Sequence, residues 1–404
     1  MRTNNKEDLI VDLKGLYVSF RTFKGYTKVL NGVNLHVKRR EKISIVGETG
    51  CGKTTTVYTI AQILARQARV DQGEVYFQGE NVLKMDKREL KKLREKGISI
   101  IFQDPIASLN PVFTVGNQMK EIVSYSGIEG AKDKRVQTER TIAALRETQL
   151  PDPERIMDSY PFQLSGGMRQ RICIAMSLAT PRDLVIADEP TTNLDVTIQD
   201  QVLKTLKQRV EEKESSLILI THSLGVARMM ADRIYVMYAG NMVEVAKSED
   251  LFREYFHPYT KGLMGCVPKL SGGGISTGIP GHLPNYMDPP KGCRFAPRCP
   301  HAAERCRQSQ PPLYEVKPEH FVACYLYEVE KKRNEYVLEV TDLKKYFPVR
   351  GQKEQFVKAI DGINFKLKAG ETLGLVGESG SGKSTTAYNV IGMEEMTGGQ
   401  VRFK

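Results

Sequence analysis

The pattern G-x-x-x-x-G-K-[ST] occurs twice in this 404-residue chain, once near each end. Each copy follows a short apolar run, 42–46 or 372–376, that we expect to be a buried strand, and each opens a segment, 55–65 or 385–391, that we expect to be helical. A glycine-rich turn at a helix N-terminus directs backbone N–H groups at an anion. The residues concerned are Gly47, Glu48, Thr49, Gly50, Cys51, Gly52, Lys53, Thr54 and Thr55 in the first copy, and Gly377, Glu378, Ser379, Gly380, Ser381, Gly382, Lys383, Ser384 and Thr385 in the second. Two such loops predict two phosphate sites on an α/β framework.

The last residues of each pattern carry the polar side chains that nucleotide chemistry needs. We expect Lys53 and Lys383 to reach the β- and γ-phosphates, and Thr54 and Ser384 to place a hydroxyl group on Mg²⁺. A chance match is improbable for two loops in the same strand-to-helix context. The loops therefore predict binding of a nucleoside triphosphate together with Mg²⁺.

An internal repeat organises the chain. Residues 9–20 align with 336–347, and residues 73–77 align with 399–403, after which only the first copy continues. We therefore expect a first domain at 1–250 with a helical subdomain at about 86–161, a region with cysteines at 251–330, and the beginning of a second domain at 331–404. We also expect the chain to be a fragment or a prematurely ended form of a two-domain protein, in which the second copy buries little core.

Strand-like and helix-like segments alternate after the first loop, which predicts an α/β domain with a largely parallel core sheet. The opening strands, separated by a polar turn at 21–27, indicate an antiparallel β edge. Polar loops are expected at 271–290, which is rich in glycine and proline, and at 331–335.

Two adjacent carboxylates, Asp188 and Glu189, end an apolar run at 183–188. Asp188 can hold Mg²⁺ and Glu189 can polarise an attacking water molecule. The simpler alternative is an acidic turn after a strand, but the phosphate loop upstream favours the catalytic interpretation.

A second candidate anion site precedes these carboxylates. Ser165, Gly166 and Gly167 come directly before an apolar helical segment at 172–178. A hydroxyl group and free backbone N–H groups at a helix N-terminus can bind phosphate. Such a turn is weak evidence alone, but its position shortly before Asp188 makes it informative.

With these motifs in this order, the chain resembles the nucleotide-binding subunits of ABC transporters. The resemblance implies an ATPase of the P-loop type, in which two domains face head to tail and each ATP lies between the phosphate loop of one and the signature motif of the other. It implies that Gln103 is the Q-loop glutamine that senses Mg²⁺ and that His222 is the switch histidine. It also implies that 165–167 is the signature motif and that 194–195 is the D-loop. Phe20 would be the aromatic residue stacked on adenine, with Phe347 as its counterpart in the second copy. Packing alone remains an alternative for Phe20.

Further segments resemble one group of this family, the dipeptide, oligopeptide and nickel importers. They are 102–111, 164–171, 257–260 and the tail 292–299. The resemblance implies an ATP hydrolase that energises import of peptides or a related small solute. Its implied partners are membrane permease subunits, indirectly a solute-binding protein, and a second ABC domain in cis or in trans, and its implied location is the cytoplasmic face of the membrane. Departures from the group's pattern occur at Phe162, Asn193 and Ser223.

Four cysteines, Cys293, Cys299, Cys306 and Cys324, form a group in the tail region. Their spacings are longer than those within the ligand pairs of zinc fingers. Four thiolates can hold an iron–sulfur cluster, and some relatives with this tail carry a [4Fe–4S] cluster there. Zinc and simple reduced thiols are the alternatives. Three cysteines lie outside this group. Cys51 belongs to the phosphate loop, and we expect Cys173 and Cys266 to be packing residues.

Composition limits the other function classes. No run approaches the 18 apolar residues of a membrane span, and the N-terminus lacks an apolar signal region, which predicts a cytosolic chain. The net charge of +11 is spread along the chain, which favours a solvated surface over nucleic-acid binding. Two alternatives stay open: a soluble ABC-type ATPase that acts on ribosomes or nucleic acid, and a fragment that does not hydrolyse ATP.

Overall fold

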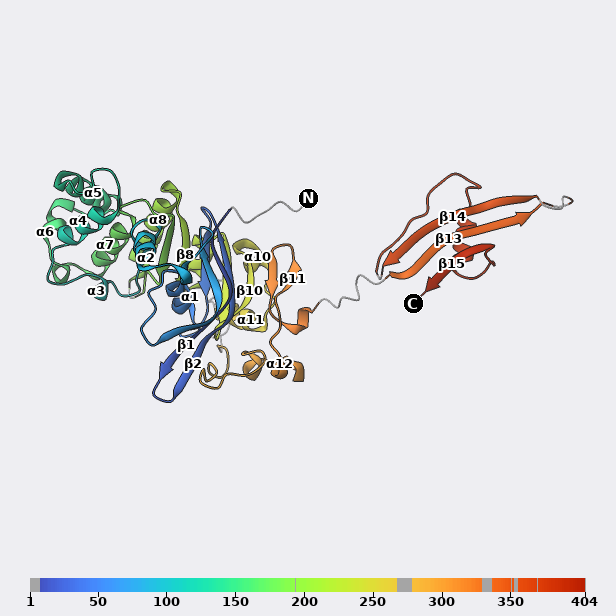
Figure 1. Cartoon of the computed structure of the whole chain (residues 1–404), viewed down its shortest axis with the longest axis horizontal. Coiled ribbons are helices and arrows are strands. Elements are labelled where there is room, and N and C mark those ends of the chain that lie inside the picture. The colour runs from blue at the N-terminus through green and yellow to red at the C-terminus, as the bar shows by residue number, and fades with distance from the viewer. Residues whose placement is uncertain are drawn as a thin grey trace. The chain divides into compact units, whose positions relative to one another are not determined.

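The computed structural model describes residues 8–192, 194–266, 278–328, 336–349, 351, 355–368 and 370–403. The chain divides into two compact units, Met1–Tyr327 and Glu328–Lys404 (Figure 1). The polar segment predicted at 331–335 lies outside the described residues, as does 271–277, the first part of the loop predicted at 271–290. The rest of that loop, 278–290, contains neither helix nor strand. Among the described residues, no helix has both the length and the apolar composition needed to cross a bilayer.

A four-stranded antiparallel sheet opens the first unit, in the order β2-β1-β4-β5. Its strands are β1 (Leu9–Thr22), β2 (Gly25–Lys38), β4 (Ala68–Phe77) and β5 (Glu80–Asn81). Residues on one face of these strands are buried, among them Val11, Leu13, Leu35 and Val75. The antiparallel β edge predicted from the opening residues is therefore confirmed.

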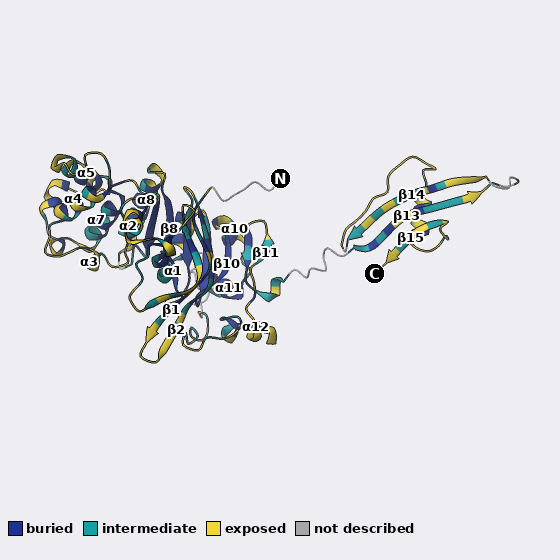
Figure 2. Cartoon of the chain, viewed as in Figure 1, coloured by how far each residue is buried: buried dark blue, intermediate teal, exposed yellow. Residues whose placement is uncertain are grey.

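The second sheet has eight strands in the order β11-β12-β10-β9-β3-β8-β7-β6. Five neighbouring strands are parallel, namely β9 (Arg233–Tyr238), β3 (Lys42–Val46), β8 (Ser216–Thr221), β7 (Leu184–Asp188) and β6 (Ile98–Ile101). The strands β10 (Asn241–Lys247), β12 (His320–Val322) and β11 (Tyr314–Lys317) continue it with antiparallel pairing. The central strands are almost entirely buried (Figure 2), which explains their continuous apolar sequences.

Two apolar cores cover the two faces of this sheet. Helix α1 (Lys53–Ile60) packs with residues of the antiparallel sheet and of β3 in one core. In the other core, α8 (Val196–Glu212), α9 (Leu224–Met230) and the end of α7 (Gly166–Leu178) pack on side chains of β7 and β8. The parallel core sheet predicted from the alternating pattern is confirmed.

A separate helical core lies beside the sheet domain. Its helices are α4 (Val115–Tyr125), α5 (Lys134–Glu147), α6 (Pro153–Asp158) and the face of α7 that carries Ile172, Cys173 and Ala175, preceded by the short α3 (Pro105–Ser108). Side-chain oxygens of Thr114, Asp133, Asp152 and Ser165 cap the N-termini of the four longer helices. The buried residues of this helical core run from Leu109 to Ala179. The subdomain was expected at about 86–161, but α2 (Lys87–Lys92) and β6, which fall in that range, contribute no residue to this core. The bounds of the helical subdomain stay a prediction.

The region after β10, up to Tyr327, belongs to the first unit and packs on its sheets. It contains α10 (Ser248–Arg253), α11 (Pro258–Gly265) and α12 (Glu304–Gln308), and its strands β11 and β12 extend the eight-stranded sheet. One core includes residues of β9 and α11 together with Phe295 from the cysteine-bearing tail. Packing therefore joins residues 278–327 to the sheet domain.

The second unit contains a three-stranded sheet in the order β14-β13-β15, built from β14 (Phe356–Lys368), β13 (Tyr336–Pro348) and β15 (Gly398–Phe403), and the helix α13 (Lys383–Val390). Its small core contains four buried apolar residues, Leu338, Val340, Leu343 and Ile360. Much of the unit is exposed or half-buried in Figure 2.

One expectation for the second unit was wrong. Residues 372–376 were expected to form a buried strand, but they have no strand structure, and Leu373, Leu375 and Val376 are exposed. Their counterpart β3 lies between β8 and β9, which donate and accept its hydrogen bonds. Residues 336–403 contain no counterpart of β8 or β9, so an isolated apolar run has nothing to pair with.

Candidate active site

The predicted catalytic residues of the first unit meet at one edge of the eight-stranded sheet. Strands β3, β8, β7 and β6 are parallel neighbours, so their carboxyl ends lie at the same edge. The first phosphate loop follows β3, His222 follows β8, the carboxylates end β7, and Gln103 follows β6. A ligand site outside the carboxyl ends of the strands is the usual arrangement in parallel α/β sheets.

Glycine is required at both ends of the first phosphate loop. Gly47 has a φ angle of 155°, and a Cβ atom there would lie 2.1 Å from the carbonyl oxygen of Met237. Gly52, with a φ angle of 107°, is the N-cap of α1, and a Cβ atom there would lie 2.8 Å from Leu30. Any larger residue would displace the loop from the helix N-terminus.

Lys53 lies along the inside of the loop. Its ammonium group donates hydrogen bonds to the carbonyl oxygens of Gly47 at 2.8 Å and Glu48 at 3.1 Å. Two of its three N–H groups are thus used, and the third can donate to a phosphate oxygen. Cys51 is buried behind the loop, and burial raises the pKa of its thiol to about 11.

Asp188 and Thr54 fit a Mg²⁺ ion. The Thr54 hydroxyl group donates to Asp188 Oδ1 at 3.2 Å. Asp188 is buried, its Oδ2 atom has no hydrogen-bond partner, and burial raises the pKa of the carboxyl group. A buried, charged carboxylate with one oxygen unsatisfied is costly, and a divalent cation with oxygen ligands removes that cost. Thr54 and Asp188 would hold the ion.

Glu189 lies at the centre of a polar cluster. Its Oε2 atom accepts hydrogen bonds from Gln103 Nε2 at 2.9 Å and from the Thr192 hydroxyl group at 3.2 Å, and it lies 3.6 Å from His222 Nδ1. The residue has a φ angle of 46°, and its backbone N–H donates to the carbonyl oxygen of Ile220 in β8. A left-handed backbone at a non-glycine residue is uncommon and is concentrated at functional sites. Gln103, Glu189 and His222 are thereby brought together.

The predicted signature residues lie elsewhere. Ser165 is the N-cap of α7, and its hydroxyl group accepts a hydrogen bond from the backbone N–H of Met168 at 3.3 Å. Ser165 and Gly166 are exposed, and no atom lies within 4 Å of the position of a Cβ atom on Gly166. This helix N-terminus is open to a phosphate group presented from outside the unit.

The remaining predicted nucleotide-binding residues are Phe20 and those of the second phosphate loop, and they lie in different surroundings. Phe20 is half-buried on β1 against the first core, so its contact with adenine stays a prediction. The second loop repeats the local geometry of the first, because Lys383 donates to the carbonyl oxygens of Gly377 and Glu378. Within the described part of 336–403, no strand ends in two carboxylates as β7 does, and the sequence of this range contains no histidine.

Four neighbouring residues were not singled out from the sequence. Thr192 lies three positions after Glu189, and Tyr58 lies one helical turn after Thr54. Burial, together with the Asp188 carboxylate, raises the pKa of Tyr58 to about 12. Helical spacing could have identified Tyr58. No local pattern points to Tyr286 and Arg298, which reach the phosphate loop from the tail region.

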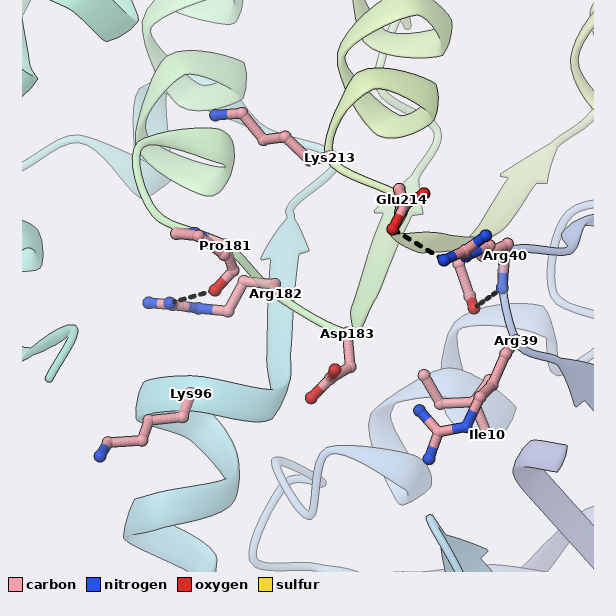
Figure 3. Close-up of a pocket in the computed structure, with 10 residues that line it drawn as sticks. Ile10, Arg39, Arg40, Lys96, Pro181, Arg182, Asp183, Lys213 and Glu214 are labelled. Carbon is pink, nitrogen blue, oxygen red and sulfur yellow. Dashed lines mark hydrogen bonds and ion pairs between the residues drawn. The ribbon is translucent and has the colours of Figure 1, made fainter. Parts of the chain in front are cut away.

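A basic cavity of about 460 Å³ lies at the opposite edge of the sheet, before the amino ends of β3, β7 and β8 (Figure 3). Two of its cations have partners: Arg40 pairs with Glu214 at 2.8 Å, and Arg182 donates to the carbonyl oxygen of Pro181 at 2.9 Å. Asp183 also lines it. This cavity is separate from the candidate active site.

The cysteine group lies partly buried in the tail region. Burial raises the pKa of Cys293 to about 11 and also raises the pKa of Cys299 and Cys324, and neighbouring thiolates of the group add to each rise. Among the described residues, no three His, Cys, Asp or Glu side chains have the arrangement of a metal site. The expectation that Cys173 packs is confirmed, whereas the same expectation for Cys266 was wrong: Cys266 is exposed, because it is the C-cap residue that follows α11 and lies beyond the packed face of the helix.

Comparisons with known proteins agree with this arrangement. A family model described as "ABC transporter" matches residues 30–192 and 360–404, and one described as "Oligopeptide/dipeptide transporter, C-terminal region" matches residues 243–306. The chain is 29% identical to the ATP-binding cassette MJ0796, solved as a dimer in a post-hydrolysis state with ADP and Pi, with a TM-score of 0.54 over 59% of this chain and 98% of that chain.

Curated relatives extend the similarity over most of the chain. A probable peptide ABC transporter ATP-binding protein of Sinorhizobium fredii is 44% identical over 80% of this chain and 97% of its own length. The dipeptide transport ATP-binding protein DppD of Bacillus subtilis is 41% identical over 78% of this chain and 94% of its length. The oligopeptide transport ATP-binding protein OppD of Mycobacterium bovis is 36% identical over 97% of this chain and 68% of its length. The chain therefore belongs to the ABC transporter family, as an ATPase with the cassette fold that uses ATP and Mg²⁺.

Proposed function

We propose that this chain binds and hydrolyses ATP to energise the import of peptides through an ABC transporter. The observation that carries the proposal is the convergence of the phosphate loop, Asp188, Glu189, Gln103 and His222 at one sheet edge. The match of residues 243–306 to the oligopeptide/dipeptide transporter C-terminal region, and the peptide transport named for the relatives, support peptides or related small solutes as the substrate class. The chain then works peripherally, at the cytoplasmic face of the membrane.

The residues of the site divide the work. Lys53 compensates phosphate charge, and Thr54 and Asp188 hold the cation. Glu189 orients the attacking water molecule, and Gln103 and His222 hold the Glu189 carboxylate in place. When bound, Mg²⁺–ATP supplies the phosphoryl group whose hydrolysis releases the free energy.

The complete site needs a second cassette. The exposed turn at Ser165 and Gly166 is positioned to contact ATP held by another domain rather than by its own loop. That other domain can be a second copy of the first unit, in trans, or a domain related to the second unit. Closure around ATP is then favoured because the closed state binds ATP more tightly than the open state.

Membrane permease subunits are the proposed partners. Apolar side chains close to Gln103 in the sequence are exposed, namely Ile106 at 64%, Val112 at 71% and Phe113 at 50%. Exposed apolar side chains that lie together mark interaction surfaces. A permease segment docked there would lie beside the glutamine that contacts Glu189, which links docking to catalysis. A solute-binding protein takes part only indirectly.

The main experiment measures ATP-dependent dimerisation. Glu189→Gln keeps the size of the side chain but removes its charge, so we expect hydrolysis to fall roughly 10²- to 10⁴-fold while ATP binding persists. Light scattering with Mg²⁺–ATP should then detect a dimer that is absent without nucleotide. Glu249→Gln, an exposed carboxylate on α10, is the matched control and should hydrolyse ATP like the wild type. A wild-type chain that neither binds nor hydrolyses ATP would refute the proposal and would favour a fragment without activity.

The partner class needs a second measurement. Affinity purification from membranes should recover permease subunits. Recovery of ribosomes or nucleic acid instead would favour the alternative of a soluble ATPase that acts on them.

We also propose that Cys293, Cys299, Cys306 and Cys324 bind a [4Fe–4S] cluster. The proposal is supported by the proximity of two of them, since the backbone N–H of Cys293 donates to the carbonyl oxygen of Cys306 at 2.7 Å. The four side chains do not have the arrangement of a metal site in this structure, so a cluster would have to draw them together. Anaerobic purification followed by iron and sulfide assays tests this proposal. Iron and sulfide in equal amounts would support it, whereas a colourless protein with zinc, or with four free thiols, would overturn it.

A further inference from the structure

The tail region contacts the phosphate loop directly. Tyr286 donates its hydroxyl hydrogen to the carbonyl oxygen of Gly50 at 2.9 Å. Arg298 Nη1 forms an ion pair with Glu48 Oε2 at 2.9 Å. These contacts come from residues more than 200 positions away in the sequence, so the shape of the loop is not set by the loop alone.

Glu48 joins three parts of this assembly. Its backbone N–H donates to the hydroxyl oxygen of Tyr259 at 2.9 Å, and its carbonyl oxygen accepts from Lys53 at 3.1 Å. Its carboxylate pairs with Arg298. A shift of Glu48 would therefore move the ammonium group that faces the phosphates.

Arg298 is itself held rigidly. Its side chain is only 6% exposed. Its Nε and Nη2 atoms donate to the carbonyl oxygens of Pro280 at 2.8 Å and Ile279 at 2.9 Å, and Nη1 also donates to the Tyr238 hydroxyl oxygen at 3.3 Å. A planar guanidinium group fixed by several acceptors has a defined position and keeps its charge at any physiological pH.

The segment that carries Arg298 also carries cysteines of the group. Cys299 is the next residue, and Phe295 lies between Cys293 and Arg298. The Phe295 ring packs against the rings of Tyr238, at 5.0 Å between centroids, and Tyr259, at 5.6 Å. The folding of the cysteine-bearing tail and the position of the Glu48 partners are therefore linked by one aromatic cluster.

The second loop provides an internal contrast. Its Glu378 corresponds to Glu48, and Lys383 donates to the Glu378 carbonyl oxygen in the same way. Among the described residues of the second unit, however, no cation pairs with the Glu378 carboxylate, and the loop is exposed. The backbone conformation of the loop thus forms without an arginine. The charge of its acidic side chain is neutralised by an ion pair in the first unit, at Glu48, but not at Glu378.

We propose that Arg298 is a positioning residue of the ATP site, which acts through Glu48. It neutralises a carboxylate at the phosphate cradle and fixes the residue that holds Lys53, so that ATP affinity depends on the fold of the cysteine-bearing tail. This inference rests on the proposed ATP binding by the first loop. An uncompensated Glu48 carboxylate would repel the phosphates, and ATP, with its additional phosphate, would be affected more than ADP.

The test measures dissociation constants of fluorescent ATP and ADP analogues for the whole chain. We expect Arg298→Ala to weaken ATP binding roughly fivefold to tenfold, the effect of about one uncompensated charge near a protein surface, and to weaken ADP binding less. Arg298→Lys should lose less than Arg298→Ala, and adding Glu48→Gln to Arg298→Ala should restore much of the ATP affinity. Arg307→Ala, an exposed arginine of the same region, should match the wild type.

The possible results separate the two proposals. If the wild type binds no ATP, the proposed function fails. If the wild type binds ATP and Arg298→Ala binds it equally well, only the role of Arg298 is refuted. The role is also refuted if Arg298→Ala weakens ATP and ADP equally and Glu48→Gln gives no recovery, because a general loss of folding would produce that pattern.

Discussion

Asp188 allows a prediction in which stability and function change in opposite directions. Its carboxylate is 1% exposed, its Oδ2 atom has no partner, and burial raises the pKa of the carboxyl group above its ordinary value of 3.8. With a raised pKa in the folded state, the folded chain retains the proton longer as the pH rises. The free energy of unfolding therefore decreases as the pH rises above 3.8, and at neutral pH the buried charge is destabilising.

The perturbation is Asp188→Asn, which keeps the shape and removes the charge. An unsatisfied buried polar group is costly, and more so when it is charged. Asn keeps a polar atom at this position but removes the charge, so we expect the variant without ligand to be more stable by about 1–3 kcal/mol, the additional cost of the charge. For a unit of this size, the gain corresponds to a rise in Tm of about 2–5 °C. The same variant should lose the added stability that Mg²⁺ gives together with ATP, because one of the two candidate cation ligands is gone.

Differential scanning calorimetry, without ligand, with ATP alone and with Mg²⁺–ATP, measures both effects. The control is Asp183→Asn, an exposed aspartate just before the other end of the same strand, for which we expect no change. A lower Tm for Asp188→Asn without ligand would refute the reasoning, since it would mean that the carboxylate is already satisfied inside the protein.

Three further predictions concern the core, the pH dependence and the loop. Ile45→Ala, in the centre of β3, should cost about 2–5 kcal/mol in urea unfolding, whereas the exposed Val112→Ala should change stability by about 0.5 kcal/mol or less. Burial lowers the pKa of His257 from 6.5 to about 4, so the unfolded chain takes up the proton first as the pH falls. The free energy of unfolding should therefore decrease by up to about 3 kcal/mol between pH 6.5 and pH 4. His257→Asn keeps an N-cap acceptor but does not titrate, so it should reduce this dependence of stability on pH. Gly47→Ala should abolish ATP binding in a nucleotide titration, because its Cβ atom would collide with the Met237 carbonyl oxygen; normal affinity would contradict the assigned loop geometry.

Much of the candidate site could be predicted from short sequence patterns. Asp188 and Glu189 were recognisable because an apolar run that ends in two acids is typical of a buried strand that leads into a catalytic turn. Gln103 and His222 follow similar runs, and the parallel order of β3, β8, β7 and β6 then brings all four residues to one edge. That order could be expected from the family resemblance but not from any one segment.

Contacts between distant segments were not predictable in this way. Arg298 and Tyr286 lie in the tail region and Tyr259 lies in α11, and nothing in their local sequence indicates that they touch the phosphate loop. Burial of Arg298 depends on which backbone carbonyl groups surround it, and those belong to 279–280. Such positions are fixed by how the tail packs on β9 and α11.

The two phosphate loops separate what sequence determined from what tertiary structure decided. In both, a lysine donates to the carbonyl oxygens of the first two loop residues, and a left-handed glycine caps the following helix. Residues within the loop make these contacts, so the local sequence is sufficient. The apolar run before each loop behaves differently: 42–46 is a central strand, whereas 372–376 is exposed and irregular. A parallel strand takes its hydrogen bonds from neighbours far along the chain, and only the first unit supplies them.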